Sequence, residues 1–158
     1  MTDMLVKLYE LPSFEEEKKN LEKQGFVIKR PIAPEASFVS QWAAQHFSEL
    51  WGNEVNVAFA KQPVSCFVAL KDKEIAGFAC YDTTTRGFFG PTGVLEKFRG
   101  QGLGKVLLLV ALEALWNMGY AYAIIGGAGP TGFYEKAVGA IAIPGSNPGI
   151  YRNLIKKI

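Results

Sequence analysis

The feature that most restricts how this chain can fold is an apolar segment from Gly102 to Met118. Drawn as a helix, the segment is hydrophobic around much of its circumference, with Leu103, Val106 and Leu107 in its first turns. Such a helix must be buried on several sides. It contains Glu113 and is too short to cross a bilayer. The segment therefore predicts an internal helix of a globular domain.

Short strand-like runs lie on both sides of this helix. Val64 to Leu70, Ile75 to Tyr81 and Gly87 to Val94 are separated by polar turns, which indicates an antiparallel meander. Gly119 ends the helix, and the nearly all-apolar run from Ala121 to Ile125 predicts a buried strand. A helix between two strands joins them in parallel by a right-handed crossover. We therefore expect an α/β fold, with a mixed sheet and helices on both faces.

The N-terminal part predicts a strand and a helix. Leu5 to Tyr9 alternates apolar and polar residues, and Ser13 with Glu16 has the spacing of a capping box. Phe26 to Lys29 follows as a further strand. We interpret residues 1–24 as a strand and helix added outside the common core of the domain.

Further elements are expected in the middle of the chain and near its C-terminal end. Pro34 can open a helix, and the aromatic segment from Phe38 to Trp51 continues an apolar helical face. Thr131 to Lys136 predicts a short helix. Ile141 to Ile143 and Ile150 to Leu154 are candidates for late strands.

Composition excludes several classes of protein. The 158 residues suit one domain, residues 1–158, and a net charge of +2 offers no clustered basic face for nucleic acid. Cys66 and Cys80 lie in apolar runs without a metal-ligand pattern, so we expect reduced, buried thiols and no metal site. The residues from Met1 to Met4 lack the pattern of a signal peptide, so the expected location is the cytoplasm, away from membranes.

A glycine-rich loop precedes the apolar helix. Its residues are Arg99, Gly100, Gln101, Gly102, Leu103, Gly104 and Lys105. Glycine permits close approach of a ligand to the backbone, and the unsatisfied N–H groups at a helix N-terminus favour a phosphate. Arg99 and Lys105 add positive charge. The loop therefore predicts a cradle for a pyrophosphate.

Two other phosphate-binding loops fail at residues that their chemistry requires. The dinucleotide fingerprint GxGxxG, started at Gly100, needs a glycine where Lys105 stands. The GxxxxGK[ST] loop needs a glycine in place of Arg99, and Val106 replaces the hydroxyl residue that would hold magnesium. A nucleotide-binding domain is therefore a weak third alternative.

With these motifs in order, the sequence resembles the GNAT superfamily of N-acetyltransferases. The family motif R/Q-x-x-G-x-G/A matches Arg99 to Gly104, and the segment from Phe133 to Lys136 resembles the F-Y-E-K segment of the family. The segment from Phe26 to Ala36 is similar to a GNAT first strand and turn. The resemblance covers Phe26 to the C-terminus.

The resemblance implies a donor, acetyl-coenzyme A, and roles for named residues. The backbone N–H groups from Gly100 to Lys105 would hold the pyrophosphate. The backbone from Thr92 to Val94 would pair with the acetyl and pantetheine groups, and Tyr134 would protonate the leaving thiolate. A thiol has a pKa of about 8.5 and a tyrosine of about 10, so this transfer is uphill but feasible.

The general base stays open at this stage. Some family members carry a glutamate early in the strand before the glycine loop, and the matching place here, near Phe88, has no carboxylate. Asp82, Glu49 and Glu54 are candidates by position, with Asp82 the first choice, and a water chain to backbone carbonyls is another candidate. His46 falls in an aromatic helical stretch and is expected to be structural or to line a pocket.

The resulting hypothesis is transfer of an acetyl group from acetyl-CoA to a primary amine, by direct attack in a ternary complex. Acceptor contacts would come from Trp42 to Asn56 and from Pro144 to Gly149. The alternative is a non-catalytic acyl-CoA sensor or interaction module. The acceptor is left open between a small molecule and a protein amine, and the late strands and the N-terminal extension offer edges for a homodimer.

Overall fold

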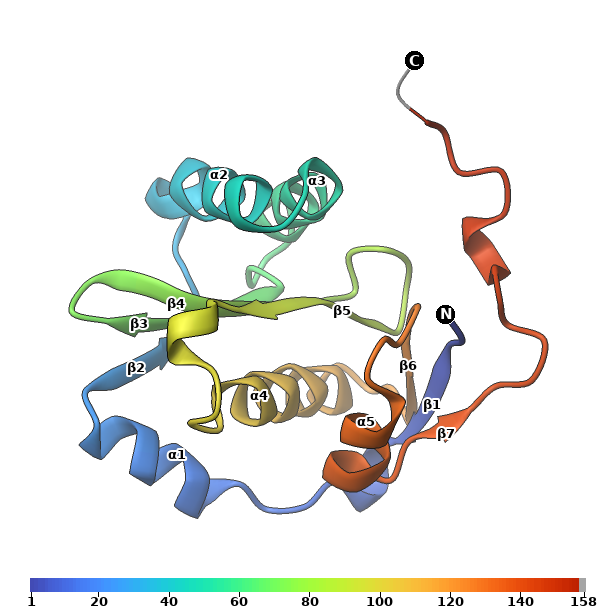
Figure 1. Ribbon diagram of the computed structural model, residues 1–158, viewed down its shortest axis with the longest axis horizontal. Helices are drawn as coiled ribbons and strands as arrows, with labels where there is room; N and C mark the ends of the chain where they lie inside the picture. The colour runs from blue at the N-terminus through green and yellow to red at the C-terminus, as the bar shows by residue number, and fades with distance from the viewer. Residues whose placement is uncertain (157–158) are drawn as a thin grey trace.

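Helix α4 (Leu103–Asn117) is buried along nearly its whole length, as its sequence predicts. In the computed structural model, which describes residues 1–156, this helix packs on one face of a seven-stranded sheet (Figure 1). Glu113 and Trp116 are exposed on its outer side. Within the described residues, no helix is long and apolar enough to cross a membrane.

The sheet is mixed, and its strand order is β2-β3-β4-β5-β6-β1-β7. Its strands are β1 (Met4–Lys7), β2 (Phe26–Lys29), β3 (Cys66–Lys71), β4 (Glu74–Tyr81), β5 (Phe88–Val94), β6 (Tyr122–Ile125) and β7 (Ile141–Ala142). The predicted antiparallel meander corresponds to β3, β4 and β5. The predicted parallel pair is β5 and β6, which α4 connects. The α/β fold with a mixed sheet is therefore confirmed.

The N-terminal strand, which belongs to the segment that we interpret as added to the common core of the domain, lies inside the sheet. Strand β1 pairs antiparallel with β6 on one side and with β7 on the other. Met4 and Val6 are fully buried in the core that α4 also fills. Two strands far apart in sequence, β6 and β7, are thus held in one sheet by the first residues of the chain.

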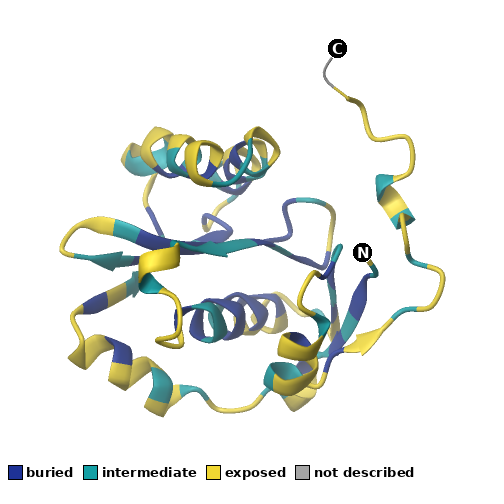
Figure 2. Ribbon diagram, in the orientation of Figure 1, coloured by how far each residue is buried: buried dark blue, intermediate teal, exposed yellow. Residues whose placement is uncertain are grey.

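Helices cover both faces of the sheet (Figure 1). They are α1 (Glu15–Lys23), α2 (Ala36–His46), α3 (Glu49–Phe59), α4 and α5 (Thr131–Val138). Helices α1 and α4 lie on one face, and α2 and α3 lie on the other. The buried residues therefore form two clusters, one around α4 and one between α2, α3 and the strands β3 and β4 (Figure 2).

Two local expectations were wrong. The aromatic helical face does not continue through Trp51, because α2 ends at His46 and α3 begins after Ser48, whose side chain accepts a hydrogen bond from the Trp51 N–H (3.2 Å). The late strand expected from Ile150 to Leu154 is absent, and a 3-10 turn occupies Gly149–Tyr151. This segment has apolar residues but finds no strand to pair with.

The central position of β1 predicts that its buried side chains matter for stability. Met4→Ala removes a fully buried side chain, and we expect the free energy of unfolding to fall by about 2–5 kcal/mol in urea denaturation. The matched control is Lys7→Ala in the same strand, where only an exposed ion pair with Glu10 is lost, at a cost of about 1 kcal/mol or less. Equal losses in both variants would contradict the placement of β1 in the core.

Candidate active site

The parallel strands β5 and β6 separate shortly after they begin to pair. Their register joins Phe88 to Ile124 and Phe89 to Ile125, and β6 ends there. Strand β5 continues to Val94 and stays paired only with β4 on its other side. The backbone groups that β5 turns toward β6 beyond Phe89 therefore have no strand partner among the described residues, and an extended ligand can pair with them.

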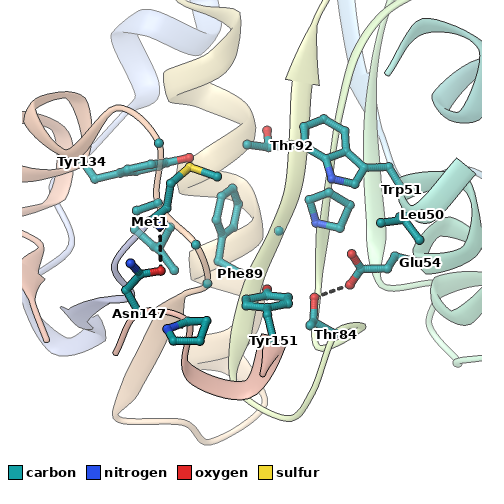
Figure 3. A pocket seen from close by; sticks show the side chains of 18 of the residues that line it. Met1, Leu50, Trp51, Glu54, Thr84, Phe89, Thr92, Tyr134, Asn147 and Tyr151 are labelled. Atoms are coloured by element: carbon teal, nitrogen blue, oxygen red, sulfur yellow. Dashed lines mark hydrogen bonds between the residues drawn. The ribbon is translucent and has the colours of Figure 1, made fainter. Parts of the chain in front are cut away.

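A cavity of about 530 Å³ opens where the two strands separate (Figure 3). Helix α3, strand β5, the loop after β6, helix α5 and the C-terminal segment each contribute to its walls. The side chains that line it include Leu50, Trp51, Glu54, Phe89, Thr92, Tyr134, Asn147 and Tyr151. The cavity thus reaches from the α3 face of the sheet to helix α5.

Tyr134 lies on one wall of this cavity, on α5. Its side chain is 6% exposed and packs edge-on against Phe133 and Phe89, with ring centroids 5.2 Å and 6.4 Å away. Burial raises the pKa of the Tyr134 hydroxyl above its usual value. The hydroxyl therefore keeps its proton at neutral pH and is available as a donor at the opening between β5 and β6.

Glu54 lies on the opposite wall, on α3 (Figure 3). Its carboxylate accepts hydrogen bonds from the hydroxyls of Thr83, at 3.4 Å, and of Thr84. Burial raises the pKa of the Glu54 carboxyl above its usual value, and these two hydrogen bonds act in the opposite direction. A half-buried carboxyl with a raised pKa is a suitable proton acceptor near neutral pH.

Asp82, the first sequence candidate for the base, lies outside the cavity lining. Its Oδ1 accepts hydrogen bonds from the Gly87 N–H (2.6 Å) and the Tyr120 hydroxyl (3.0 Å). Its Oδ2 is 3.4 Å from Lys61 Nζ. With φ at +61° and 6% exposure, Asp82 closes the turn between β4 and β5. Tyr134, Thr92 and Glu54 all line the cavity, whereas Asp82 does not.

The glycine-rich loop leads directly into the N-terminus of α4. Gly100 and Gly102 have φ of +81° and +91°, a region that side chains disfavour, and a Cβ at either would meet no atom within 4 Å. Gly102 stands at the N-cap of α4, and no side chain caps the helix. The first N–H groups of the helix, from Leu103 to Lys105, are therefore available to an anion.

The basic side chains beside the loop have other partners. Arg99 Nε donates to the Val94 carbonyl at 3.1 Å, and Lys105 Nζ lies 3.6 Å from Glu17 on α1. Thr92 donates its hydroxyl to the Phe78 carbonyl at 3.0 Å. The loop thus presents its backbone more than its charged side chains.

Other candidates from the sequence do not line the cavity, and some residues that do line it were missed. Glu49 and His46 do not line the cavity; the His46 ring lies against Trp42. Asn147, from the expected acceptor segment Pro144–Gly149, does line it. Tyr151 was missed because its segment looked like a strand, and an aromatic residue after the last strand carries no periodic signal that could mark it.

Comparison with protein families identifies the class that this fold and site define. The family model for the GNAT family of acetyltransferases matches residues 32–140. The match spans more than half of the chain, so the chain belongs to the GNAT acetyltransferase family. No curated protein sequence matches it.

Solved structures share the fold at low sequence identity. The GCN5-related glucosamine N-acetyltransferase region of a fungal multi-domain GH3 beta-N-acetylglucosaminidase superposes with a TM-score of 0.72 at 13% identity, over 90% of this chain and 19% of that one. A GCN5-related N-acetyltransferase from Sphaerobacter thermophilus superposes with a TM-score of 0.67 at 17% identity, over 90% of this chain and 48% of that one. A GNAT family acetyltransferase from Brucella melitensis, in complex with acetyl-CoA, superposes with a TM-score of 0.57 at 19% identity, over 75% of this chain and 86% of that one. The chain spans about a fifth and about half of the first two chains.

The loop predicts a matched pair of glycine variants. Gly102→Val and Gly119→Val place a β-branched residue at similar positive φ at the two ends of α4, and each should cost about 1–2 kcal/mol of stability. Only Gly102→Val alters the exposed N–H groups, so we expect it to weaken coenzyme A binding at least about tenfold by calorimetry. Unchanged affinity in Gly102→Val would remove the loop from the binding site.

The raised pKa of Glu54 predicts a pH-dependent gain in stability from Glu54→Gln. Above the unfolded-state pKa of about 4.3, ionisation of the half-buried carboxyl lowers the stability of the folded state. The amide is never ionised and can still accept from Thr84, so the variant should be more stable than the parent at pH 7.

Urea denaturation of the parent and of Glu54→Gln, at pH 7 and below about pH 4, measures this gain in stability. The difference between the two proteins should disappear below about pH 4, where the parent carboxyl is neutral in both states. Exposed Glu113→Gln is the control and should show no comparable gain. A Glu54→Gln variant that is less stable at pH 7 would contradict the desolvation of this carboxyl.

Proposed function

We propose that this chain, as a single domain, transfers an acetyl group from acetyl-CoA to a primary amine. One observation carries the proposal: the opening between β5 and β6 leads into a cavity with a protonated tyrosine, Tyr134, on one side and a carboxyl of raised pKa, Glu54, on the other. Membership of the GNAT acetyltransferase family supports the same reaction.

The donor would lie along β5 and across the start of α4. Its pyrophosphate would accept hydrogen bonds from the backbone N–H groups between Gly100 and Lys105, where no side chain competes. Its pantetheine arm would pair with the backbone from Thr92 to Val94, on the side of β5 that lacks a strand. The thioester would then reach the cavity near Tyr134.

The amine must lose a proton before or as it attacks. An alkylammonium has a pKa of about 10.4, so a base is needed at neutral pH. We assign this role to Glu54, since Asp82 is held by Gly87, Tyr120 and Lys61 and does not line the cavity. The base would act on the amine directly or through a water molecule.

The reaction then needs no covalent enzyme intermediate. The amine nitrogen forms a bond to the thioester carbonyl carbon, and the carbon–sulfur bond breaks. Glu54 takes one proton of the ammonium, which leaves a neutral amine to attack. The departing thiolate takes the proton of the Tyr134 hydroxyl, and the second proton that the nitrogen loses as the amide forms restores that hydroxyl through solvent. Both cysteines are fully buried in β3 and β4, and the pKa of the Cys80 thiol is raised by burial, so neither supplies a nucleophile.

Release of coenzyme A thiol, followed with a disulfide dye, tests the function. With acetyl-CoA and a primary amine we expect turnover that Tyr134→Phe and Glu54→Gln each lower about 10²-fold or more in kcat, with little change in affinity for acetyl-CoA. Loss of the proton donor should affect kcat more than KM, because Tyr134 acts on the leaving group.

The controls separate the two candidate functions. Phe133→Leu, beside Tyr134 but half exposed, should keep most of the rate. Tight binding of acetyl-CoA without thiol release, over a broad amine panel, would support the non-catalytic sensor instead. A Tyr134→Phe variant of unchanged rate would remove the acid role of that residue.

A further inference from the structure

Resting on the proposed function, the α3 side of the cavity indicates the chemical class of the acceptor. We propose that the acceptor is a primary amine with a single positive charge on an apolar body of about aromatic size, and without a carboxylate beside the amine. Three properties of the cavity carry this inference: its charge, its aromatic walls and the position of Tyr151.

The charge of the cavity matches one ammonium group. Glu54 is the one acidic side chain that lines it within residues 1–156, and no lysine, arginine or histidine of that range does so. The cationic amino group of Met1 donates to Asn147 Oδ1 at 3.0 Å, on the side of the cavity away from Glu54 (Figure 3). An acceptor carboxylate or phosphate would enter this cavity without a cationic side chain, and a second ammonium would lack a carboxylate.

The walls around Glu54 are aromatic and held in place. Trp51 precedes Glu54 by three residues on α3, so both side chains share one face of that helix. The Trp51 ring packs against Phe47 and Phe78, with centroids 5.1 Å and 6.0 Å away. Phe89 forms the floor between the Glu54 and Tyr134 walls (Figure 3). An apolar body can displace water from these surfaces without loss of hydrogen bonds.

Tyr151 brings a further aromatic wall next to Glu54 (Figure 3). Its hydroxyl lies so close to the backbone of Gly126 that a Cβ there would be 3.0 Å from the Tyr151 oxygen. Burial raises the pKa of Tyr151, and the charges of Glu54 and Asp3 raise it further. The ring is therefore neutral beside a carboxylate, a combination that favours an ammonium through both ion pairing and a cation–π contact.

A panel of matched amines tests this inference. We expect kcat/KM for 2-phenylethylamine to exceed that for phenylalanine, which adds only a carboxylate, and that for butane-1,4-diamine, which has a second ammonium group in place of the aromatic ring, by about tenfold or more. Ethylamine, which lacks the aromatic body, should also react poorly. The same amines are titrated by calorimetry into the protein saturated with coenzyme A, so that binding is measured without turnover.

Variants of Tyr151 and Trp51 provide the second measurement. Tyr151→Ala and Trp51→Ala should raise KM for 2-phenylethylamine about tenfold while KM for acetyl-CoA stays within about twofold. Tyr151→Phe keeps the ring and should retain the parent KM. Trp116→Ala, exposed on α4 and outside this cavity, is the control. If Trp51→Ala fails to fold, the comparison of Tyr151→Ala with Tyr151→Phe tests the aromatic wall on its own.

The outcomes separate this inference from the proposed function. Thiol release that is as fast with phenylalanine or butane-1,4-diamine would overturn the acceptor class while acetyl transfer stands. Binding of 2-phenylethylamine without thiol release would support the ligand class and overturn the transfer. Absence of both binding and turnover with 2-phenylethylamine overturns the inference, whatever the other amines do.

Discussion

The site depends on one constraint, the separation of two parallel strands that are held together only at their start. Strands β5 and β6 share two residue pairs, and then β6 ends while β5 continues. The connecting helix α4 is buried on nearly all sides, so both strands are fixed to the same core below this point. The opening is therefore set by the backbone of the sheet, at the point where β6 ends.

The carboxylates of Asp82 and Glu54 have different surroundings and therefore suit different roles. Asp82 has a hydrogen bond or ion pair to three neighbours and organises the turn that carries β4 into β5. Glu54 accepts hydrogen bonds from the threonine hydroxyls of Thr83 and Thr84, and burial raises the pKa of its carboxyl. A carboxylate with an ion pair and several hydrogen bonds stabilises structure, whereas a partly desolvated one with neutral hydroxyl partners is disposed to take up a proton. The geometry therefore favours Glu54 for chemistry and Asp82 for the fold.

Local patterns predicted most of the elements, and nonlocal pairing explains the errors. The runs around Cys66, Phe78 and Phe89 became the meander because short polar turns leave antiparallel neighbours few alternatives. The place of β1 could not be read from its own residues, since alternation predicts a strand but not its partners. The segment around Tyr151 has apolar residues like a strand, yet it pairs with none of the described strands and forms a 3-10 turn.

The sequence by itself determined the class of fold, the buried helix and the glycine-rich loop before it, because periodicity and backbone freedom are local properties. It also indicated the family through the order of these motifs. Only the tertiary structure decided which carboxylate faces the cavity and that Tyr151 joins its wall. Burial, pairing and pKa depend on neighbours that arrive from distant segments. Glu54, Tyr134 and Tyr151 come from α3, α5 and the C-terminal segment, and the packing of the chain around the sheet brings them together.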